Sequence, residues 1–216
     1  MAVGDLLLEP EKWGWRMGYA RVAGTDEAGR GALAGPLVAA AVILPEEREL
    51  AGLEGLTDSK LLAPEKRRQF FRTIIEVAES WNYACVAPGT IDSGGLQPAN
   101  LSAMREAVAG LKPEPDLVIV DFYKVDDLEI PQWGLVHGDR VCRSVAAASV
   151  LAKVIRDHLM MVWAVLYPEY GFEKNKGYGT EQHWKALDEL GPLPCHRASF
   201  KGVNQMELQL DEEYGA

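Results

Sequence analysis

The chain has 216 residues, of which 48% are hydrophobic and 25% are charged, and its formal net charge at pH 7 is -10. This length suits one domain with a single core, and the composition is that of a globular protein. No apolar run reaches membrane-spanning length, and no basic-then-apolar signal sequence follows residue 1. We therefore expect a cytoplasmic protein that has no membrane partner.

The three cysteines, Cys85, Cys142 and Cys195, are odd in number and lie outside any Cys-x-x-Cys pattern. This usage predicts reduced thiols, which form neither disulfides nor a zinc site. The negative net charge is weak evidence against a nucleic-acid partner, because contacts to phosphates need lysine and arginine. It does not exclude a protein that holds metal ions with carboxylates and has only a local basic rim.

Apolar runs predict five strands, and helical periodicity bounded by proline and glycine predicts the helices between and after them. In chain order, the expected elements are strands at 19–23 and 36–44, a helix from residue 64, a strand at 81–87, a helix at 98–111, strands at 117–120 and 133–137, a long helix at 140–167, a loop at 174–180 and a helix at 181–190. This order predicts an α/β fold, in which helices flank a mixed central sheet. We expect one domain over residues 1–216, with a small C-terminal helical segment from about residue 168.

Two adjacent carboxylates, Asp26 and Glu27, follow the first expected strand, and the turn Gly29-Arg30-Gly31 comes next. Adjacent residues on a regular strand point to opposite faces, so both can serve one site only if the strand breaks or bulges there. One alternative is an ordinary acidic turn of a hairpin. Another is a dinucleotide-binding glycine loop, but such a loop should open a helix, and Pro36 begins a further strand instead.

Two more carboxylates follow other expected strands, since Asp121 ends the strand at 117–120 and Asp139 follows the strand at 133–137. Sites in open α/β sheets form at the carboxyl ends of strands. Each residue also has a simpler interpretation, because Asp121 can merely end a strand and Asp139 can cap the long helix. Asp157, which lies off the apolar stripe of that helix, is expected to be a surface ion-pair residue.

Clustered carboxylates raise one another's pKa unless a cation lies among them. Their hard oxygen atoms suit Mg²⁺ or Mn²⁺ better than zinc. Two such ions, about 3.5–4 Å apart, can activate water and stabilise the leaving oxygen in phosphodiester hydrolysis. The residues therefore predict a site for divalent cations.

Seven further segments follow one another in the chain: Asp-Glu-Ala-Gly-Arg-Gly (26–31), Thr-Asp-Ser-Lys (57–60), Val-Asp (120–121), Gly-Asp (138–139), Ala-Ala-Ala-Ser-Val-Leu-Ala-Lys (146–153), Gly-Tyr-Gly-Thr (177–180) and His-Arg-x-Ser-Phe-Lys-Gly (196–202). Together they resemble ribonuclease HII over about residues 19 to 203. The first and the Gly-Tyr-Gly-Thr segments are highly specific as a pair. The resemblance implies a ribonuclease H-like fold and a monomeric endonuclease dependent on Mg²⁺ or Mn²⁺.

The implied substrates are DNA duplexes with embedded ribonucleotides, nicked on the 5′ side of the ribonucleotide, and the RNA strand of RNA–DNA hybrids. By motif position, the resemblance implies three groups of site residues: Asp26, Glu27, Asp121 and Asp139 as metal ligands, Gly29, Arg30, Gly31 and Tyr178 as sensors of the 2′-hydroxyl, and Ser59, Lys60 and Arg197 as contacts to the substrate backbone.

The sequence departs from the family pattern at two positions. His137 stands where a lysine usually precedes the Gly-Asp pair, and Phe122 replaces a residue that is often small. Two other functions stay open at this stage. One is a non-catalytic nucleic-acid-binding module of the same fold, and the other is a nuclease of that fold with different junction specificity.

Overall fold

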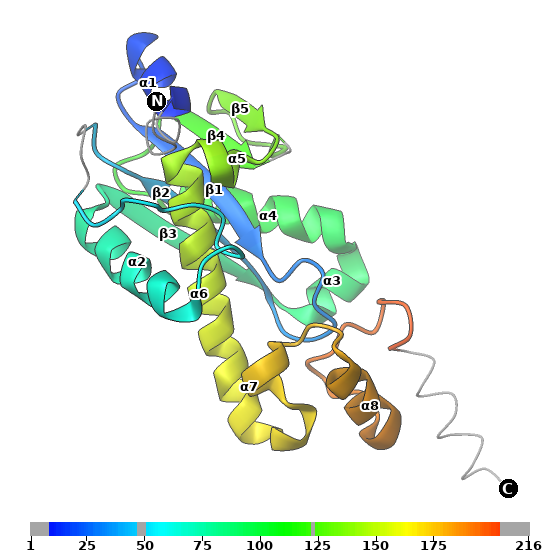
Figure 1. Cartoon of the computed structure of the whole chain (residues 1–216). Coiled ribbons are helices and arrows are strands. Elements are labelled where there is room, and N and C mark those ends of the chain that lie inside the picture. The colour runs from blue at the N-terminus through cyan, green and yellow to red at the C-terminus, as the bar shows by residue number, and fades with distance from the viewer. Residues whose placement is uncertain (1–8, 47–50, 122–123, 204–216) are drawn as a thin grey trace, which may run out of the picture. The chain divides into compact units, whose positions relative to one another are not determined.

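The structure is a computed structural model that describes residues 9–46, 51–121 and 124–203 (Figure 1). The departure at Phe122 and the acidic residues at 207–213 lie outside this described part. The chain divides into two compact units. The first contains residues up to 28 together with 38–84 and 101–154, and the second contains 29–37, 85–100 and the residues from 155 onward.

A five-stranded sheet, in the order β3-β2-β1-β4-β5, forms most of the first unit (Figure 1). Strand β1 pairs antiparallel with β2 and parallel with β4, and β4 pairs parallel with β5, so the expected mixed sheet is confirmed. All seven residues of β2 are buried, as its unbroken apolar run predicts. The strands are β1 Val22–Ala28, β2 Leu37–Ile43, β3 Ser80–Val86, β4 Leu117–Asp121 and β5 Gln132–Leu135.

The sequence analysis required a break or bulge in the strand for Asp26 and Glu27 to serve one site. That requirement is wrong, because the strand is unbroken and the charges of both residues still act on Lys60. Strand β1 continues through both residues, each of which pairs with an alanine of β2. Pairing with β2 continues as far as Ala28 and holds the backbone extended up to the glycine turn, whereas the pairing with β4 reaches Thr25. The parallel register pairs Thr25 with Val120, and its continuation puts Asp26 level with Asp121.

Helices follow the order α1, α2, α3, α4, α5, α6, α7 and α8, with a 3₁₀ turn at Pro168–Tyr170. The sequence analysis did not predict α1, α3 or α7, whereas α8 has the bounds expected of it. None of the helices in the described part of the chain combines the length and apolarity needed to cross a membrane. The bounds are α1 Glu9–Arg16, α2 Pro64–Val77, α3 Pro88–Gly94, α4 Leu96–Ala109, α5 Gly138–Val141, α6 Arg143–Leu166, α7 Phe172–Asn175 and α8 Glu181–Leu190.

The single helix expected over 140–167 is instead two helices, because Cys142 has extended backbone angles (φ -126°, ψ 122°) between α5 and α6. The buried carboxylate of Glu11, on α1, accepts a hydrogen bond from the backbone N of Ser144 at 2.7 Å. It also accepts one from Sγ of Cys142 at 3.2 Å. A side chain 133 residues away therefore satisfies the backbone amide of Ser144, which a continuous helix would have bonded internally.

The start of α6 packs directly on the middle of β1. A Cβ atom built at Gly24 would lie 2.2 Å from the carbonyl carbon of Ser144, so only glycine allows this contact. Residues 146–148 of α6 are fully buried alanines, as expected of a helix that approaches a sheet closely. The apolar stripe predicted for the second half of α6 is wrong, since Val162 and Leu166 are 56% and 64% exposed while Arg156 is buried.

Candidate active site

Asp26 lies on the face of the sheet that α6 covers. Side chains alternate along a strand, so Asp26 shares the face of Gly24, which packs against the start of α6. Its carboxyl group is buried, and its Oδ1 accepts a hydrogen bond from the backbone N of Glu27 at 2.7 Å. Burial, and then the charges of Glu27 and Asp121, raise the pKa of Asp26 well above its usual range, although a hydrogen bond from Ser149 lowers it.

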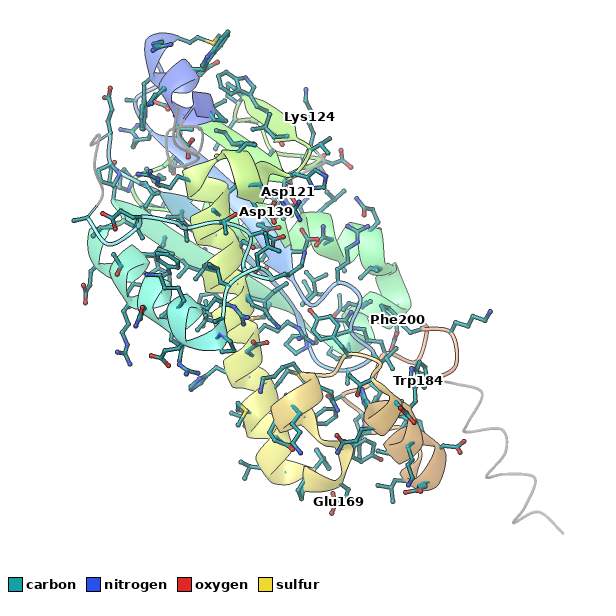
Figure 2. All side chains as sticks on the ribbon, in the orientation of Figure 1. Asp121, Lys124, Asp139, Glu169, Trp184 and Phe200 are labelled. Carbon is teal, nitrogen blue, oxygen red and sulfur yellow. The ribbon has the colours of Figure 1, made fainter. Side chains whose placement is uncertain are left out.

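Asp121, the last residue of β4, and Asp139, in α5, lie near each other (Figure 2). The backbone N of Gly138 donates a hydrogen bond to Oδ1 of Asp121 at 2.7 Å. Burial, followed by the charges of Asp58 and Asp121, raises the pKa of Asp139 to about 6. The interpretation of Asp139 as the cap of a long helix is wrong, because it lies inside the short helix α5, whose N-cap is His137.

His137 has a left-handed backbone (φ 59°), which is unusual for a residue other than glycine. This conformation turns the chain directly before Gly138, whose N–H then faces Asp121. The positive charge that His137 can carry lowers the pKa of Asp121, which burial raises. The residue that departs from the family pattern thus contributes to the electrostatics of the carboxylates.

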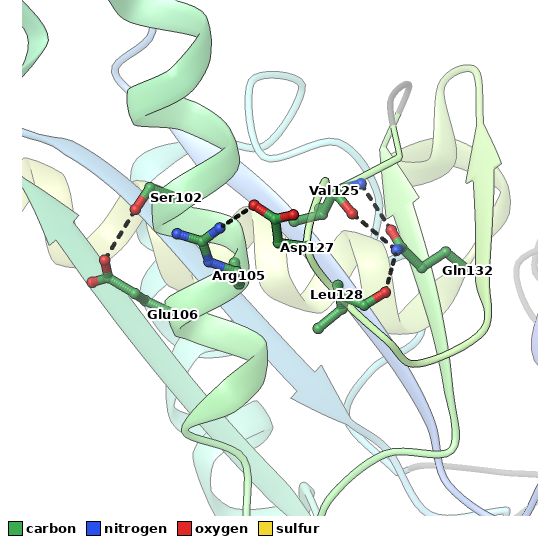
Figure 3. A network of polar contacts seen from close by, with 7 residues as sticks. All are labelled: Ser102, Arg105, Glu106, Val125, Asp127, Leu128 and Gln132. Atoms are coloured by element: carbon green, nitrogen blue, oxygen red, sulfur yellow. Dashed lines mark hydrogen bonds and ion pairs between the residues drawn. The ribbon is translucent and has the colours of Figure 1, made fainter. Parts of the chain in front are cut away.

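The connection from β4 to β5 is held by the side-chain amide of Gln132 (Figure 3). Its Oε1 accepts from the backbone N of Val125 at 2.8 Å, and its Nε2 donates to the carbonyl of Val125 at 2.9 Å. A further bond from Nε2 reaches the carbonyl of Leu128 at 3.2 Å, and Arg105 of α4 pairs with Asp127 at 3.3 Å. These contacts join residues 125–128 to the start of β5 and to α4.

Lys60 is the cation that the carboxylate cluster requires. Burial lowers its pKa, but the charges of four carboxylates more than offset this, so that the pKa of Lys60 is raised; in decreasing order they belong to Asp26, Asp58, Asp139 and Glu27. Burial raises the pKa of Asp121 and of Asp139, and the positive charge of Lys60 partly offsets this rise. Lys60 therefore stays protonated beside the cluster.

Asp58 is a buried carboxylate of this site that the sequence analysis did not select. Its Oδ1 accepts from the backbone N of Lys60 at 2.9 Å, and its Oδ2 lies 3.4 Å from Nη2 of Arg140. The hydroxyls of Ser59 and Ser149 are 3.0 Å apart, which joins the 57–60 segment to α6. The signal available in the sequence was the Thr-Asp-Ser-Lys segment itself, of which only Ser59 and Lys60 were named.

The donor set fits a hard divalent cation in its chemistry, since it consists of carboxylates whose mutual repulsion a cation would relieve. Within the described residues, no three side chains of Asp, Glu, His or Cys already converge on one point where they could hold an ion. Asp26, Glu27, Asp121 and Asp139 nevertheless act on one another's pKa values or on that of Lys60, so the first unit brings all four predicted carboxylates into one electrostatic cluster.

The remaining predicted residues belong to the second unit. Gly29 has a left-handed backbone (φ +89°), and Nη2 of Arg30 donates to Oε1 of Gln97 at 2.6 Å. Tyr178 is partly buried and lies under the guanidinium of Arg156, 5.1 Å from the ring centroid. Arg197 is fully buried, and its guanidinium donates to the carbonyls of Arg30 (2.9 Å) and Gly35 (3.0 and 3.2 Å).

Comparison with known proteins identifies the family. The family model described as Ribonuclease HII matches residues 23–203. The chain belongs to the ribonuclease HII family. Ribonuclease HII of Desulfitobacterium hafniense (strain Y51) is 48% identical over 207 residues, which are 96% of this chain and 77% of that protein. Membership makes the protein a ribonuclease H enzyme, an endonuclease that acts on nucleic acids, as the motifs predicted.

Solved structures of ribonucleases H share the fold. The ribonuclease H2 of Pyrococcus horikoshii OT3 superposes with a TM-score of 0.78 at 26% identity, covering 89% of this chain and 99% of that one. Bst-RNase HIII, solved in complex with Mn²⁺, superposes with a TM-score of 0.66 at 21% identity, covering 92% and 73%. The expected ribonuclease H-like fold is therefore confirmed.

Proposed function

We propose that this ribonuclease H cleaves the phosphodiester on the 5′ side of a ribonucleotide embedded in duplex DNA, and also the RNA strand of RNA–DNA hybrids. The observation that carries the proposal is the cluster of Asp26, Glu27, Asp121 and Asp139 around Lys60, in a chain of the ribonuclease HII family. A module that only binds nucleic acid would gain nothing from buried carboxylates, because they repel phosphates.

The four carboxylates are proposed to hold Mg²⁺ or Mn²⁺, with Asp26 and Asp121 as principal ligands and Glu27 and Asp139 completing the site. Bound divalent ions supply an activated water and charge stabilisation in phosphodiester hydrolysis, for which two ions are proposed here. A related fold has been solved with Mn²⁺, which supports a divalent cation without choosing between the two. Gly138 orients Asp121 for this role through its 2.7 Å hydrogen bond.

Lys60 and Ser59 are proposed to contact the substrate backbone. Lys60 supplies a positive charge beside a strongly acidic site, which offsets the repulsion between that site and a phosphate. Ser59 is buried and its hydroxyl lies 3.0 Å from that of Ser149, so this contact joins the 57–60 segment to α6.

The turn Gly29-Arg30-Gly31 and Tyr178 are proposed to sense the 2′-hydroxyl, which is the group that distinguishes RNA from DNA. In the described part of the chain, no atom lies within 4 Å of a Cβ built at Gly31, so a ligand can approach its backbone closely. Arg197 was expected to contact the substrate backbone, but its buried guanidinium bonds Arg30 and Gly35. We propose that it acts by holding the turn.

We also infer a monomer that works in the cytoplasm, where thiols such as Cys85, Cys142 and Cys195, all free here, stay reduced. The activity test incubates the protein with a duplex that carries one ribonucleotide, with and without Mg²⁺ or Mn²⁺, and maps the cut. An all-DNA duplex and the Asp121→Asn variant serve as controls. A cut at any other position, or equal cutting of the all-DNA duplex, would show a different junction specificity.

A further inference from the structure

Arg156 of α6 is a fully buried cation that bonds two separate segments of the second unit. Its Nε donates to the carbonyl of Pro36 at 2.9 Å, and its Nη2 donates to the carbonyl of Ala34 at 2.9 Å. Its Nη1 donates to the carbonyl of Lys176, also at 2.9 Å, two residues before Tyr178. One guanidinium thus ties residues 34–36, which follow the glycine turn, to the segment that carries the tyrosine.

The same guanidinium touches both candidate sensors of the 2′-hydroxyl. Its Cζ lies over the ring of Tyr178, 5.1 Å from the centroid. A Cβ built at Gly29 would lie 2.0 Å from Nε of Arg156, so this glycine is required by the arginine as well as by its own left-handed backbone. Gly31 makes no such close contact, because no atom of the described residues lies within 4 Å of a Cβ built at this position.

A buried guanidinium is a costly way to fill space, because a charge taken out of water must be compensated by hydrogen bonds. An apolar side chain of similar volume fills such a place at no electrostatic cost. Arginine adds a rigid planar fork that fixes the directions of several acceptors at once. In Arg156, the three hydrogen bonds described above fix the carbonyls of Ala34, Pro36 and Lys176 relative to one another.

Backbone hydrogen bonds join the same two segments, and a second arginine bonds the first of them. The carbonyl of Gly177 accepts hydrogen bonds from the backbone N of Leu33 at 2.8 Å and of Ala34 at 3.2 Å. Arg197 bonds the carbonyls of Arg30 and Gly35, on the same turn and its continuation. Residues 33–36, which follow the turn at 29–31, are therefore bonded to the segment of Tyr178, and Arg197 bonds both the turn and these residues.

We propose that Arg156 is a positioning residue for ribonucleotide recognition, which sets the spacing between the Gly29-Arg30-Gly31 turn and Tyr178. The proposal rests on the proposed function, since it assigns these two segments to the ribose. Nothing in it involves the carboxylate cluster, so loss of Arg156 should damage the choice between RNA and DNA and leave binding of divalent ions intact.

The test measures affinity rather than cleavage. The Asp121→Asn background prevents turnover, and dissociation constants are measured for a duplex with one ribonucleotide and for the same sequence in DNA alone. Adding Arg156→Lys keeps the charge but removes the planar fork. We expect the preference for the ribonucleotide to fall by up to roughly tenfold, or to vanish if the background preference is smaller, because this is the change in affinity that corresponds to the loss of one hydrogen bond to the 2′-hydroxyl.

The matched control is Tyr170→Phe in the same background, which removes a buried hydroxyl bonded to the carbonyl of Gly191 at 2.6 Å. It lies in the same unit and should leave the preference unchanged at equal folded fraction. A preference unchanged in a folded Arg156→Lys protein would overturn the proposal. If the background protein shows no preference, the proposed recognition of the ribose fails first, and Arg156 has nothing to position.

A cycle with Tyr178→Phe provides a second readout. If Arg156 positions the ring, the effect of Tyr178→Phe on the preference should shrink once Arg156 is lysine, whereas independent effects would add. Should Arg156→Lys fail to fold, hydrogen exchange of the wild-type amides of Leu33 and Ala34 decides. Protection comparable to that of α6 supports a rigidly held turn, and exchange within seconds overturns it.

Discussion

The backbone N–H of Gly138 points at Asp121, and the 2.7 Å hydrogen bond between them joins the end of β4 to the start of α5. This bond fixes the orientation of the Asp121 carboxylate. Its donor, Gly138, directly precedes Asp139, the second carboxylate of the pair. The geometry of both therefore depends on the left-handed turn at His137.

Gly138→Ala should lower turnover by roughly tenfold through misplacement of a catalytic group. The new Cβ would lie 3.3 Å from Oδ1 of Asp121 and 3.4 Å from Cγ1 of Val145, so the carboxylate must shift by a few tenths of an ångström. The measurement is the cleavage rate at saturating metal, with Gly89→Ala as control, because no described atom lies within 4 Å of its Cβ. Equal rates for the two variants would show that the orientation of Asp121 is not critical.

Asp139→Asn should abolish most turnover, whereas Asp157→Asn should leave it nearly normal. Asp139 is buried in the carboxylate cluster and interacts with Asp121. Asp157 is only partly buried, and its charge acts on Arg156, where it partly offsets the lowering of the pKa that burial causes. Cleavage rates of both variants, at matched folded fraction, separate the two assignments. If Asp157→Asn lost most of its cleavage rate and Asp139→Asn kept a nearly normal rate, the two assignments would be reversed.

Without metal, Asp139→Asn should raise the melting temperature at pH 7 and have little effect near pH 4. The pKa of Asp139 is raised from 3.8 to about 6 in the folded chain. A raised pKa means that the folded state binds the proton more tightly, so this stabilisation is present below pH 3.8 and is lost as pH rises through about 6. Melting curves in a chelator across this range test the sign, and a variant that is less stable at pH 7 contradicts it.

Tyr178→Ala should lower cleavage at a lone ribonucleotide by far more than it lowers stability. Tyr178→Phe removes only the hydroxyl, and one hydrogen bond worth about 0.5–1.5 kcal/mol corresponds to a roughly two- to tenfold slower reaction. Rates are compared at matched folded fraction on a duplex with one ribonucleotide. If Tyr178→Ala cleaved at the wild-type rate, the tyrosine would only pack against its neighbours. The glycine turn would then be the remaining candidate sensor of the 2′-hydroxyl.

Glu11→Ala should destabilise the protein by about 0.5–2 kcal/mol, the range measured for the loss of a helix cap. The carboxylate bonds the backbone N of Ser144 at the start of α6, and alanine leaves that amide without this acceptor. Urea denaturation gives the change in free energy of unfolding. Glu11→Gln keeps an acceptor oxygen and should recover much of it, and equal losses for both variants would show that the hydrogen bond is not the cause.

Local patterns in the sequence were sufficient for much of the fold and for the carboxylates. The apolar run at 36–44 predicted buried β2, and the helix expected at 181–190 matches the bounds of α8. Asp121 and Asp139 could be found because they follow strands, and the ends of parallel strands meet at one edge of a sheet. The family motifs then supplied the chemistry.

Only the tertiary structure decided how β1 and the long helix behave. Strand β1 stays regular through Asp26 because β2 pairs with it as far as Ala28, and the helix divides at Cys142, where Glu11 from α1 supplies the acceptor. Arg156 reads in the sequence as one more polar residue of α6, yet it is fully buried because three carbonyls from two distant segments surround it. Side-chain periodicity reports what a residue's own helix or strand favours, whereas burial of a charge depends on acceptors that distant parts of the chain bring to it.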